Sequence, residues 1–170
     1  MTGKKSNIIL TGMPGSGKST IGVILAKLTG RDFIDTDILI QTAEGRTLQD
    51  IVDKDGHMAL RRIEEDILLD ITCRRHVIAT GGSAVYSRRA MEHLVSDGVI
   101  VFLEADIDTL ESRVKDFTRR GLAKRPDQSF ADLFAERVPL YRKYAEITVT
   151  CAGQSHDEVC ARIIDRLDFY

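Results

Sequence analysis

Short apolar runs alternate with longer helical patterns along the chain. Five runs are continuously apolar and too short for helices, and they predict strands buried on both faces: residues 7–10, 33–35, 77–80, 99–103 and 147–150. The segments between them carry apolar residues at three- and four-residue spacing, which predicts amphipathic helices, most clearly over 18–29 and 58–71. Strands that alternate with helices indicate an α/β protein whose parallel sheet is covered on both sides.

Residues 117–129 depart from this alternation. Their sequence, FTRRGLAKRPDQS, contains four basic side chains, a glycine and a proline, without an apolar period. This composition predicts an exposed, mobile loop that serves as a lid. The remaining sequence contains no repeat, low-complexity tract or linker, so we expect residues 1–170 to form a single domain.

Composition and charge restrict the classes of function. The 24 Lys and Arg nearly balance the 26 Asp and Glu, which argues against general binding to nucleic acid or anionic membranes and favours a small polar partner. The three cysteines lack C-x-x-C spacing, which is typical of reduced thiols rather than of a disulfide or zinc framework. The N-terminal apolar run is too short for a signal peptide or membrane span, so we expect a cytoplasmic protein.

The sequence GMPGSGKST contains the pattern G-x-x-x-x-G-K-[ST] between the first predicted strand and the first predicted helix. Its glycines allow backbone N–H groups to face phosphate oxygens, and the positive end of the following helix adds to their attraction. Lys18 supplies charge for the β- and γ-phosphates, and the Ser19 hydroxyl is a ligand for Mg²⁺. The alternative is a glycine-rich turn that only caps a helix, but such a turn would not need a strand directly before it and a helix directly after it. The predicted nucleotide-binding residues are Gly12, Met13, Pro14, Gly15, Ser16, Gly17, Lys18, Ser19 and Thr20.

Many classes of protein share this phosphate-binding loop, or P-loop. The chain lacks the N-K-x-D string with which GTPases bind guanine, and it lacks the apolar strand ending in Asp-Glu of motors and AAA-type ATPases. These features favour a small-molecule kinase, which needs a pocket for the phosphate acceptor beside the nucleotide.

Two carboxylates follow the second predicted strand. If the chain stays extended through FIDTD, Asp35 and Asp37 point to the same side, at the edge of the sheet where parallel strands end and ligands bind. One carboxylate then serves the water shell of the metal, and the other receives the acceptor hydroxyl. The alternative is that Asp37 caps the helix that follows.

Arg61 lies on a predicted helix, and an arginine can bind a carboxylate through two parallel hydrogen bonds. Glu64 and Glu65 lie three and four residues beyond it, so an ion pair within the helix explains the same spacing. The spacing alone leaves both interpretations open.

The motifs GMPGSGKST, FIDTD, LRRIEED, VIATGG, KRP and ERVPLYRKYAEITV occur in an order and spacing that resemble the shikimate kinases, over residues 6–168. The resemblance implies a three-layer α/β/α P-loop kinase fold like that of the nucleoside monophosphate kinases, with a five-stranded parallel sheet. It also implies MgATP-dependent phosphorylation of the 3-hydroxyl of shikimate, a step in aromatic amino-acid biosynthesis.

The resemblance further implies roles for individual residues. Lys18 and Ser19 would hold phosphate and Mg²⁺, Asp35 would act through metal-bound water, and Asp37 would orient the attacking hydroxyl. Four more sites would complete the machinery: Arg61 and Arg137 on the shikimate carboxylate, Gly81 and Gly82 as backbone N–H donors to the acceptor, Arg125 on the transferring phosphate and Arg113 against adenine.

Four residues depart from the family pattern on the acceptor side: Val52 and Leu60 replace aromatic residues, Ser83 replaces a third glycine and Asp127 replaces a leucine. These changes imply a looser pocket or a different acceptor, because they remove flat apolar walls and place an anion where leucine would exclude water. Two alternatives therefore accompany shikimate kinase. One is a paralogous kinase for another hydroxylated acid or polyol, and the other is a catalytically silent, ATP-binding regulatory protein. In each case we expect a monomer that binds ATP, Mg²⁺ and a small molecule.

Overall fold

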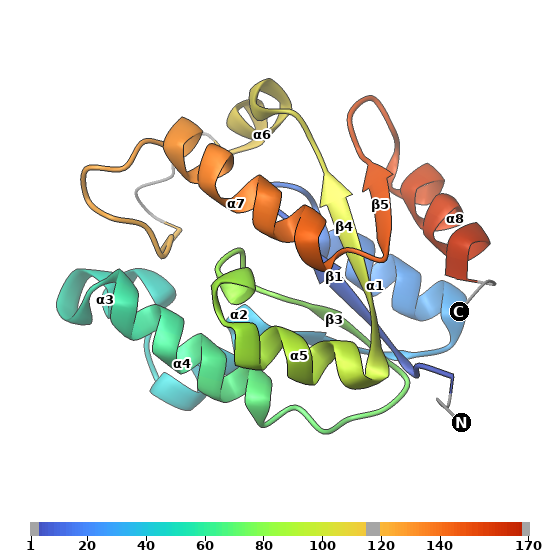
Figure 1. Ribbon diagram of the computed structural model, residues 1–170, viewed down its shortest axis with the longest axis horizontal. Helices are drawn as coiled ribbons and strands as arrows, with labels where there is room; N and C mark the ends of the chain where they lie inside the picture. The colour runs from blue at the N-terminus through green and yellow to red at the C-terminus, as the bar shows by residue number, and fades with distance from the viewer. Residues whose placement is uncertain (1–3, 115–119, 168–170) are drawn as a thin grey trace.

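The computed structural model describes residues 4–114 and 120–167. Five parallel strands form one sheet in the order β2-β3-β1-β4-β5, with bounds Asn7–Thr11 (β1), Asp32–Asp35 (β2), His76–Ala79 (β3), Gly98–Glu104 (β4) and Ile147–Thr150 (β5) (Figure 1). All five predicted strands are confirmed. The expectation of burial on both faces is wrong for β2 and β5, which contain exposed residues because they are the edges of the sheet.

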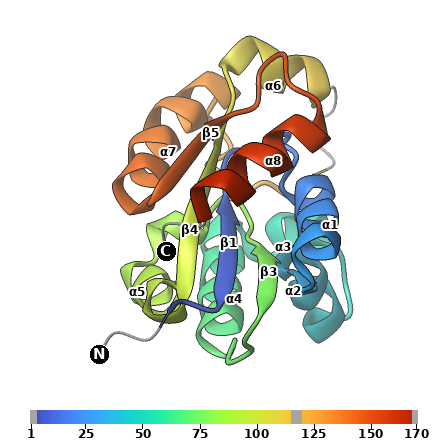
Figure 2. The same ribbon diagram turned by 90° about the vertical axis from the view of Figure 1, so that its right-hand side faces the viewer.

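Helices cover both faces of the sheet. Their bounds are Lys18–Thr29 (α1), Thr36–Glu44 (α2), Leu48–Asp55 (α3), His57–Leu69 (α4), Arg88–Asp97 (α5), Ile107–Arg113 (α6), Phe130–Tyr144 (α7) and His156–Leu167 (α8), with a 3₁₀ turn at Ala84–Tyr86 (η1). Helices α1 and α8 pack together on one face, and α4, α5 and α7 lie on the other (Figure 2). Among the described residues, no helix is long and apolar enough to cross a membrane.

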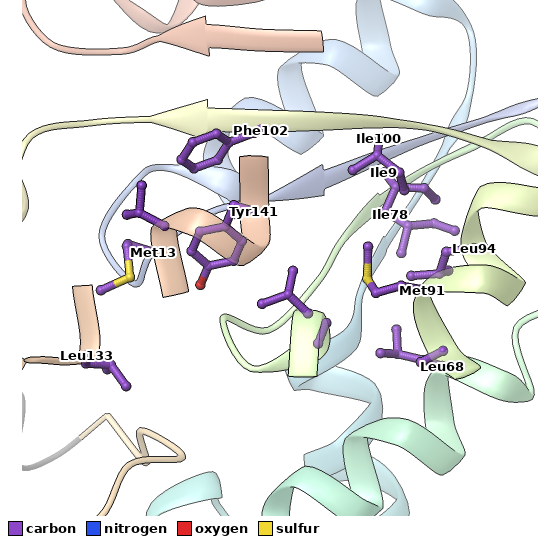
Figure 3. Packing of buried hydrophobic residues seen from close by; sticks show 14 of the residues in the cluster. Ile9, Met13, Leu68, Ile78, Met91, Leu94, Ile100, Phe102, Leu133 and Tyr141 are labelled. Atoms are coloured by element: carbon purple, nitrogen blue, oxygen red, sulfur yellow. The ribbon is translucent and has the colours of Figure 1, made fainter. Parts of the chain in front are cut away.

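Successive residues of each central strand supply opposite cores, because side chains alternate across a sheet. Ile8 and Leu10 of β1 pack with α1 and α8, whereas Ile9 packs with α4, α5 and α7. In the second of these cores, the Phe102 ring of β4 stacks on the Tyr141 ring of α7, with centroids 5.3 Å apart (Figure 3). The continuous apolar runs of the sequence are thus explained by burial on both faces.

The strand order places the functional loops. The chain leaves central strand β1 for β2 and β3, and then crosses to β4 on the opposite side of β1. Ligands bind in open parallel sheets at the carboxyl ends of strands where the direction of winding reverses. The P-loop follows β1 and residues 80–83 follow β3, so both loops lie at this point.

The predicted lid is only partly as expected. Residues 117–119 lie outside the described part of the chain, and residues 120–129 form a loop before α7. Within that loop Gly121, Ala123 and Gln128 are buried, which corrects the prediction of an exposed segment. The reason is tertiary contact: the Gly121 N–H donates to the Gln49 side chain, and the Ala123 carbonyl accepts from Arg137.

Candidate active site

The P-loop curls tightly between β1 and α1. Gly15 has φ of +84°, and a Cβ there would lie 2.5 Å from a methyl group of Val114, so glycine is required. The Lys18 ammonium donates to the carbonyl oxygens of Gly12 and Met13, at 2.8 Å and 3.0 Å. Burial lowers the pKa of Lys18 to about 8, although the nearby Asp37 carboxylate opposes this shift. The Lys18 ammonium is thus held by backbone carbonyl oxygens of the P-loop.

Asp35 ends β2 and caps α2. Its Oδ1 accepts the N–H of Asp37 at 3.0 Å, and its Oδ2 accepts the Ser19 hydroxyl at 2.5 Å. Two sequence interpretations are thereby corrected: Asp35, rather than Asp37, is the helix cap, and the chain turns into α2 instead of staying extended. The pair of Ser19 and Asp35 offers hard oxygen ligands of the kind that Mg²⁺ prefers.

Asp37 lies in the first turn of α2 and lines the same cavity as Lys18. Burial raises the pKa of Asp37, the neighbouring Asp35 raises it further, and Lys18 lowers it. The Asp37 carboxylate is therefore placed to receive a proton or to hold a hydroxyl beside the P-loop.

The two glycines after β3 allow side chains to approach the backbone closely. A Cβ on Gly81 would lie 2.3 Å from Oε1 of Glu64, and one on Gly82 would lie 2.6 Å from Nη1 of Arg137. The Gly81 N–H donates to the Thr36 hydroxyl at 3.0 Å, and its role as a donor to the acceptor stays a prediction. The bare backbone makes room for charged groups.

Glu64 is a site residue that sequence reasoning did not identify, since it was considered only as an ion-pair partner of Arg61. It is 3% exposed, lines the cavity and accepts a hydrogen bond from the Ser83 hydroxyl. Burial raises the pKa of Glu64 to about 7, and the Ser83 hydrogen bond opposes that rise. The position of Glu64 in the cavity wall becomes visible only in the structure, where the loop after β3 packs against α4.

Arg137 of α7 is 1% exposed and lines the cavity. Its Nη2 donates to the Ala123 carbonyl at 3.0 Å, and its Nε donates to the Tyr86 hydroxyl at 3.4 Å. The Tyr141 hydroxyl, one turn further along α7, donates to the Gly82 carbonyl at 2.6 Å. Helix α7 thus fixes a guanidinium in the wall of the cavity, beside Gly82.

Two predicted arginines lie elsewhere. The described residues that line the cavity do not include Arg61 or Arg125. The Arg61 guanidinium stacks on the Tyr86 ring, 3.6 Å from its centroid, and lies 4.0 Å from Glu136. Arg125 lies 3.6 Å from the other oxygen of Glu136. Within the described chain Arg61 forms no ion pair with Glu64 or Glu65, so the intrahelical interpretation is wrong.

The cavity has a volume of about 340 Å³ and unites the P-loop with the acceptor-side loop. Eleven predicted site residues line it: Pro14, Gly15, Gly17, Lys18, Ser19, Thr20, Asp37, Gly81, Gly82, Arg113 and Arg137. Arg113 at the end of α6 is exposed and donates to the Gly15 carbonyl at 3.3 Å. Arg120 also lines the cavity and was not singled out from the sequence, because four basic residues of the loop looked equivalent.

Unpartnered buried atoms support a ligand site. In the described part of the chain, three buried side-chain atoms lack a hydrogen-bond partner: Ser16 Oγ in the P-loop, Glu64 Oε1 and Arg61 Nε. Buried polar groups are nearly always paired in folded proteins. Ser16 belongs to the P-loop and Glu64 lines the cavity, so these two atoms fit a polar ligand with phosphate at the P-loop and hydroxyl or carboxylate groups beside α4.

The acceptor-side departures differ in their surroundings. Leu60 is buried and lines the cavity with Ile40 and Ala123, so an apolar wall persists without an aromatic ring. The Asp127 side chain is 85% exposed, whereas the neighbouring Gln128 is buried. The expected intrusion of an anion into the pocket at Asp127 is therefore wrong, because that side chain points to solvent.

The family model described as shikimate kinase matches residues 14–168. The chain belongs to the shikimate kinase family. Curated relatives of that name include one from Thermodesulfovibrio yellowstonii, 38% identical over 161 residues, covering 93% of this chain and 92% of the relative. Another, from Pasteurella multocida, is 36% identical and covers 97% of each chain.

A solved structure gives the same result for the fold. A shikimate kinase from Acinetobacter baumannii in complex with shikimate matches with a TM-score of 0.89 at 30% identity, covering 97% of this chain and 94% of that chain. The predicted three-layer α/β/α P-loop kinase fold is confirmed. As in other members of the shikimate kinase family, the P-loop of this chain therefore belongs to a kinase.

Proposed function

We propose that this chain phosphorylates the 3-hydroxyl of shikimate with ATP. The observation that carries the proposal is the single cavity in which Lys18 of the P-loop, Asp37 of α2 and Arg137 of α7 meet. The relative from Acinetobacter baumannii that binds shikimate shares this fold along nearly the whole chain. A carboxylate beside a phosphate-binding loop and an arginine in the same cavity suit a hydroxy acid as acceptor.

We assign the nucleotide side to the P-loop. Lys18 and the loop N–H groups would hold the phosphates, Ser19 and Asp35 would hold Mg²⁺, and Arg113 would lie against adenine. When bound, MgATP supplies the transferable phosphoryl group and neutralises part of its charge. The orphaned Ser16 hydroxyl and the paired oxygens of Ser19 and Asp35 fit such a ligand.

The acceptor side works mainly by positioning. Asp37 accepts the hydrogen bond of the attacking hydroxyl, and Arg137 binds the acceptor carboxylate. Arg61 and Arg125 serve the same acceptor and the transferring phosphate once they leave Glu136, which holds both in the structure described here. Phosphoryl transfer needs little covalent help from the protein, so alignment of the two substrates is the principal contribution.

We further propose a cytoplasmic monomer whose partners are ATP, Mg²⁺ and the acceptor, with no role for nucleic acid or membrane. Supply of ATP favours the cytoplasm, and the near balance of 24 basic and 26 acidic residues supports the absence of a polyanionic partner.

A coupled assay of ADP release with a panel of acceptors tests the function. Shikimate, quinate, simple polyols and water alone are compared at saturating MgATP. We expect shikimate to give the highest kcat/KM. Faster turnover of another acceptor would establish the paralogous kinase, and ATP binding without release of ADP for any acceptor would establish the silent regulatory protein.

A further inference from the structure

Ser83 fixes the orientation of a buried carboxyl group. It is 7% exposed, directly follows Gly82, and its hydroxyl donates to Oε2 of Glu64. The other carboxyl oxygen of Glu64 is buried and has no hydrogen-bond partner in the described part of the chain. A glycine at position 83 would leave Glu64 without this donor. The hydroxyl therefore decides which Glu64 oxygen remains available to a ligand.

The available oxygen lies beside Asp37. A Cβ atom placed on Gly81 would lie 2.3 Å from Glu64 Oε1 and 2.9 Å from Asp37 Oδ1. The two carboxyl groups therefore converge over that glycine. Both residues line the cavity. An ionised carboxylate only accepts hydrogen bonds, so two converging carboxylates call for a ligand that brings two donors. Neighbouring hydroxyl groups on one ring provide such donors.

We propose that Ser83 is a positioning residue that holds Glu64 so that its free oxygen accepts a second acceptor hydroxyl, adjacent to the hydroxyl bound by Asp37. The inference rests on the proposed function and adds a specificity to it, because a substrate with a single hydroxyl would leave Glu64 unpaired. For shikimate, the neighbour of the 3-hydroxyl is the 4-hydroxyl. Glu64 is then a substrate contact, and Ser83 acts through it.

The charges around Glu64 determine how this contact responds to pH. Lys18 of α1, Asp37 of α2 and Arg137 of α7 face Glu64 from the elements packed against it, and Arg61 lies on its own helix. Burial raises the pKa of Glu64 to about 7; Asp37 raises it, whereas the Ser83 hydrogen bond, Arg137 and Lys18 lower it. The accepting, ionised form thus gains population as pH rises through neutrality. Loss of Ser83 raises this pKa further.

Ser83→Ala is the decisive variant, and Ser87→Ala is its matched control. The Ser87 hydroxyl also donates to a glutamate of α4, Glu65, but neither residue lines the acceptor cavity. For Ser83→Ala we expect KM for shikimate to rise about tenfold with KM for ATP unchanged, as for loss of a hydrogen bond to a charged group. The acid limb of kcat/KM should move to higher pH. Ser87→Ala should keep both the KM values and the pH profile.

A comparison of two acceptors tests the contact in the wild-type protein itself, so this measurement does not depend on whether a variant folds. Wild-type protein should use 4-deoxyshikimate with a kcat/KM about tenfold below that of shikimate. Ser83→Ala should then treat the two acceptors nearly alike, because the contact is already lost. A Glu64→Gln variant should lose the acid limb that Glu64 contributes, because an amide does not ionise in this range.

The outcomes separate this inference from the proposed function. Turnover of shikimate by wild type with equal kcat/KM for the 4-deoxy acceptor would overturn the role of Glu64 while leaving the function intact. An unchanged KM and pH profile in folded Ser83→Ala would overturn the role of Ser83. Absence of shikimate turnover by folded wild type would overturn the function, and the inference with it.

Discussion

Asp37 owes its chemistry to its place in the first turn of α2. The positive end of a helix favours a carboxylate, whereas burial and the adjacent Asp35 oppose ionisation. Lys18 lowers the pKa of Asp37, and Asp37 in turn raises that of Lys18. At the scale of single residues, the two groups therefore depend on each other, and a change in one alters the charge of the other.

Replacement of Asp37 by Asn keeps the shape of the side chain and removes its charge. We expect kcat for shikimate to fall about 100-fold or more, because the attacking hydroxyl loses its proton acceptor. Steady-state kinetics at saturating ATP measure this. Asp32→Asn is the control, since Asp32 lies at the opposite end of β2 with its side chain 86% exposed. Equal losses in both variants would contradict the role of Asp37.

The Ser19 hydroxyl and the Asp35 carboxylate together make the proposed metal site. Chelation with EDTA should abolish release of ADP, and added Mg²⁺ should restore it. Ser19→Ala should require a higher Mg²⁺ concentration for half-maximal activity, because one ligand is lost. A Mg²⁺ titration of the ADP assay gives this value, with Ser112→Ala on the exposed part of α6 as control. Full activity in EDTA would refute the assignment.

At the scale of elements, α7 and the loop before it together form part of the cavity wall. A capping box between Ser129 and Asp132 starts α7, and Gln128 immediately precedes it. The Gln128 amide donates to Glu136 at 3.0 Å, while its oxygen accepts the Arg125 N–H at 3.3 Å. The loop is thereby tied to the helix that carries Arg137.

Substitution of Gln128 by leucine should destabilise this chain. Glu136 and the Arg125 N–H each lose one hydrogen bond, which costs about 1–2 kcal/mol in the free energy of unfolding. Urea denaturation measures the change. Asp127→Leu provides the comparison, because the Asp127 side chain is 85% exposed and its loss should have little effect. A larger decrease in the free energy of unfolding for Asp127→Leu than for Gln128→Leu would contradict the assignment of Gln128 as the buried residue of the pair.

The elements themselves were largely predictable. Every strand was found because continuous apolar runs are sufficient when both faces of a sheet are covered. The P-loop was found because its glycines are required locally, as at Gly15. The turn from β2 into α2 was missed, since Asp35 and Asp37 fit either an extended chain or a cap and only the hydrogen bonds distinguish them.

At the scale of the whole molecule, the site depends on contacts between segments far apart in sequence. Ser83 and Gly81 approach Glu64 from the loop after β3, and Arg61 contacts Tyr86 and Glu136 rather than its helical neighbours. No periodicity or spacing encodes these approaches. The sequence therefore predicts which residue types line the cavity more reliably than which partners these residues have.

Binding of nucleotide should stabilise the whole fold, because the P-loop joins β1 to α1 at the centre of the sheet. MgATP at a hundredfold excess over its Kd should raise the unfolding free energy by about 2.7 kcal/mol and raise Tm accordingly. Thermal denaturation with and without MgATP measures this effect. Lys18→Ala should show a much smaller rise, whereas Lys54→Ala at the end of α3 should respond like wild type. An equal rise in Lys18→Ala would contradict its role in binding phosphate.

Tyr141 connects the acceptor pocket directly to the interior of the protein. Its ring is fully buried against Phe102, and its hydroxyl holds the carbonyl of Gly82. For inhibitor design, this side of the pocket is rigid, because moving Gly82 would require the core to be repacked. Compounds should therefore gain affinity by matching the outline of this side of the pocket closely.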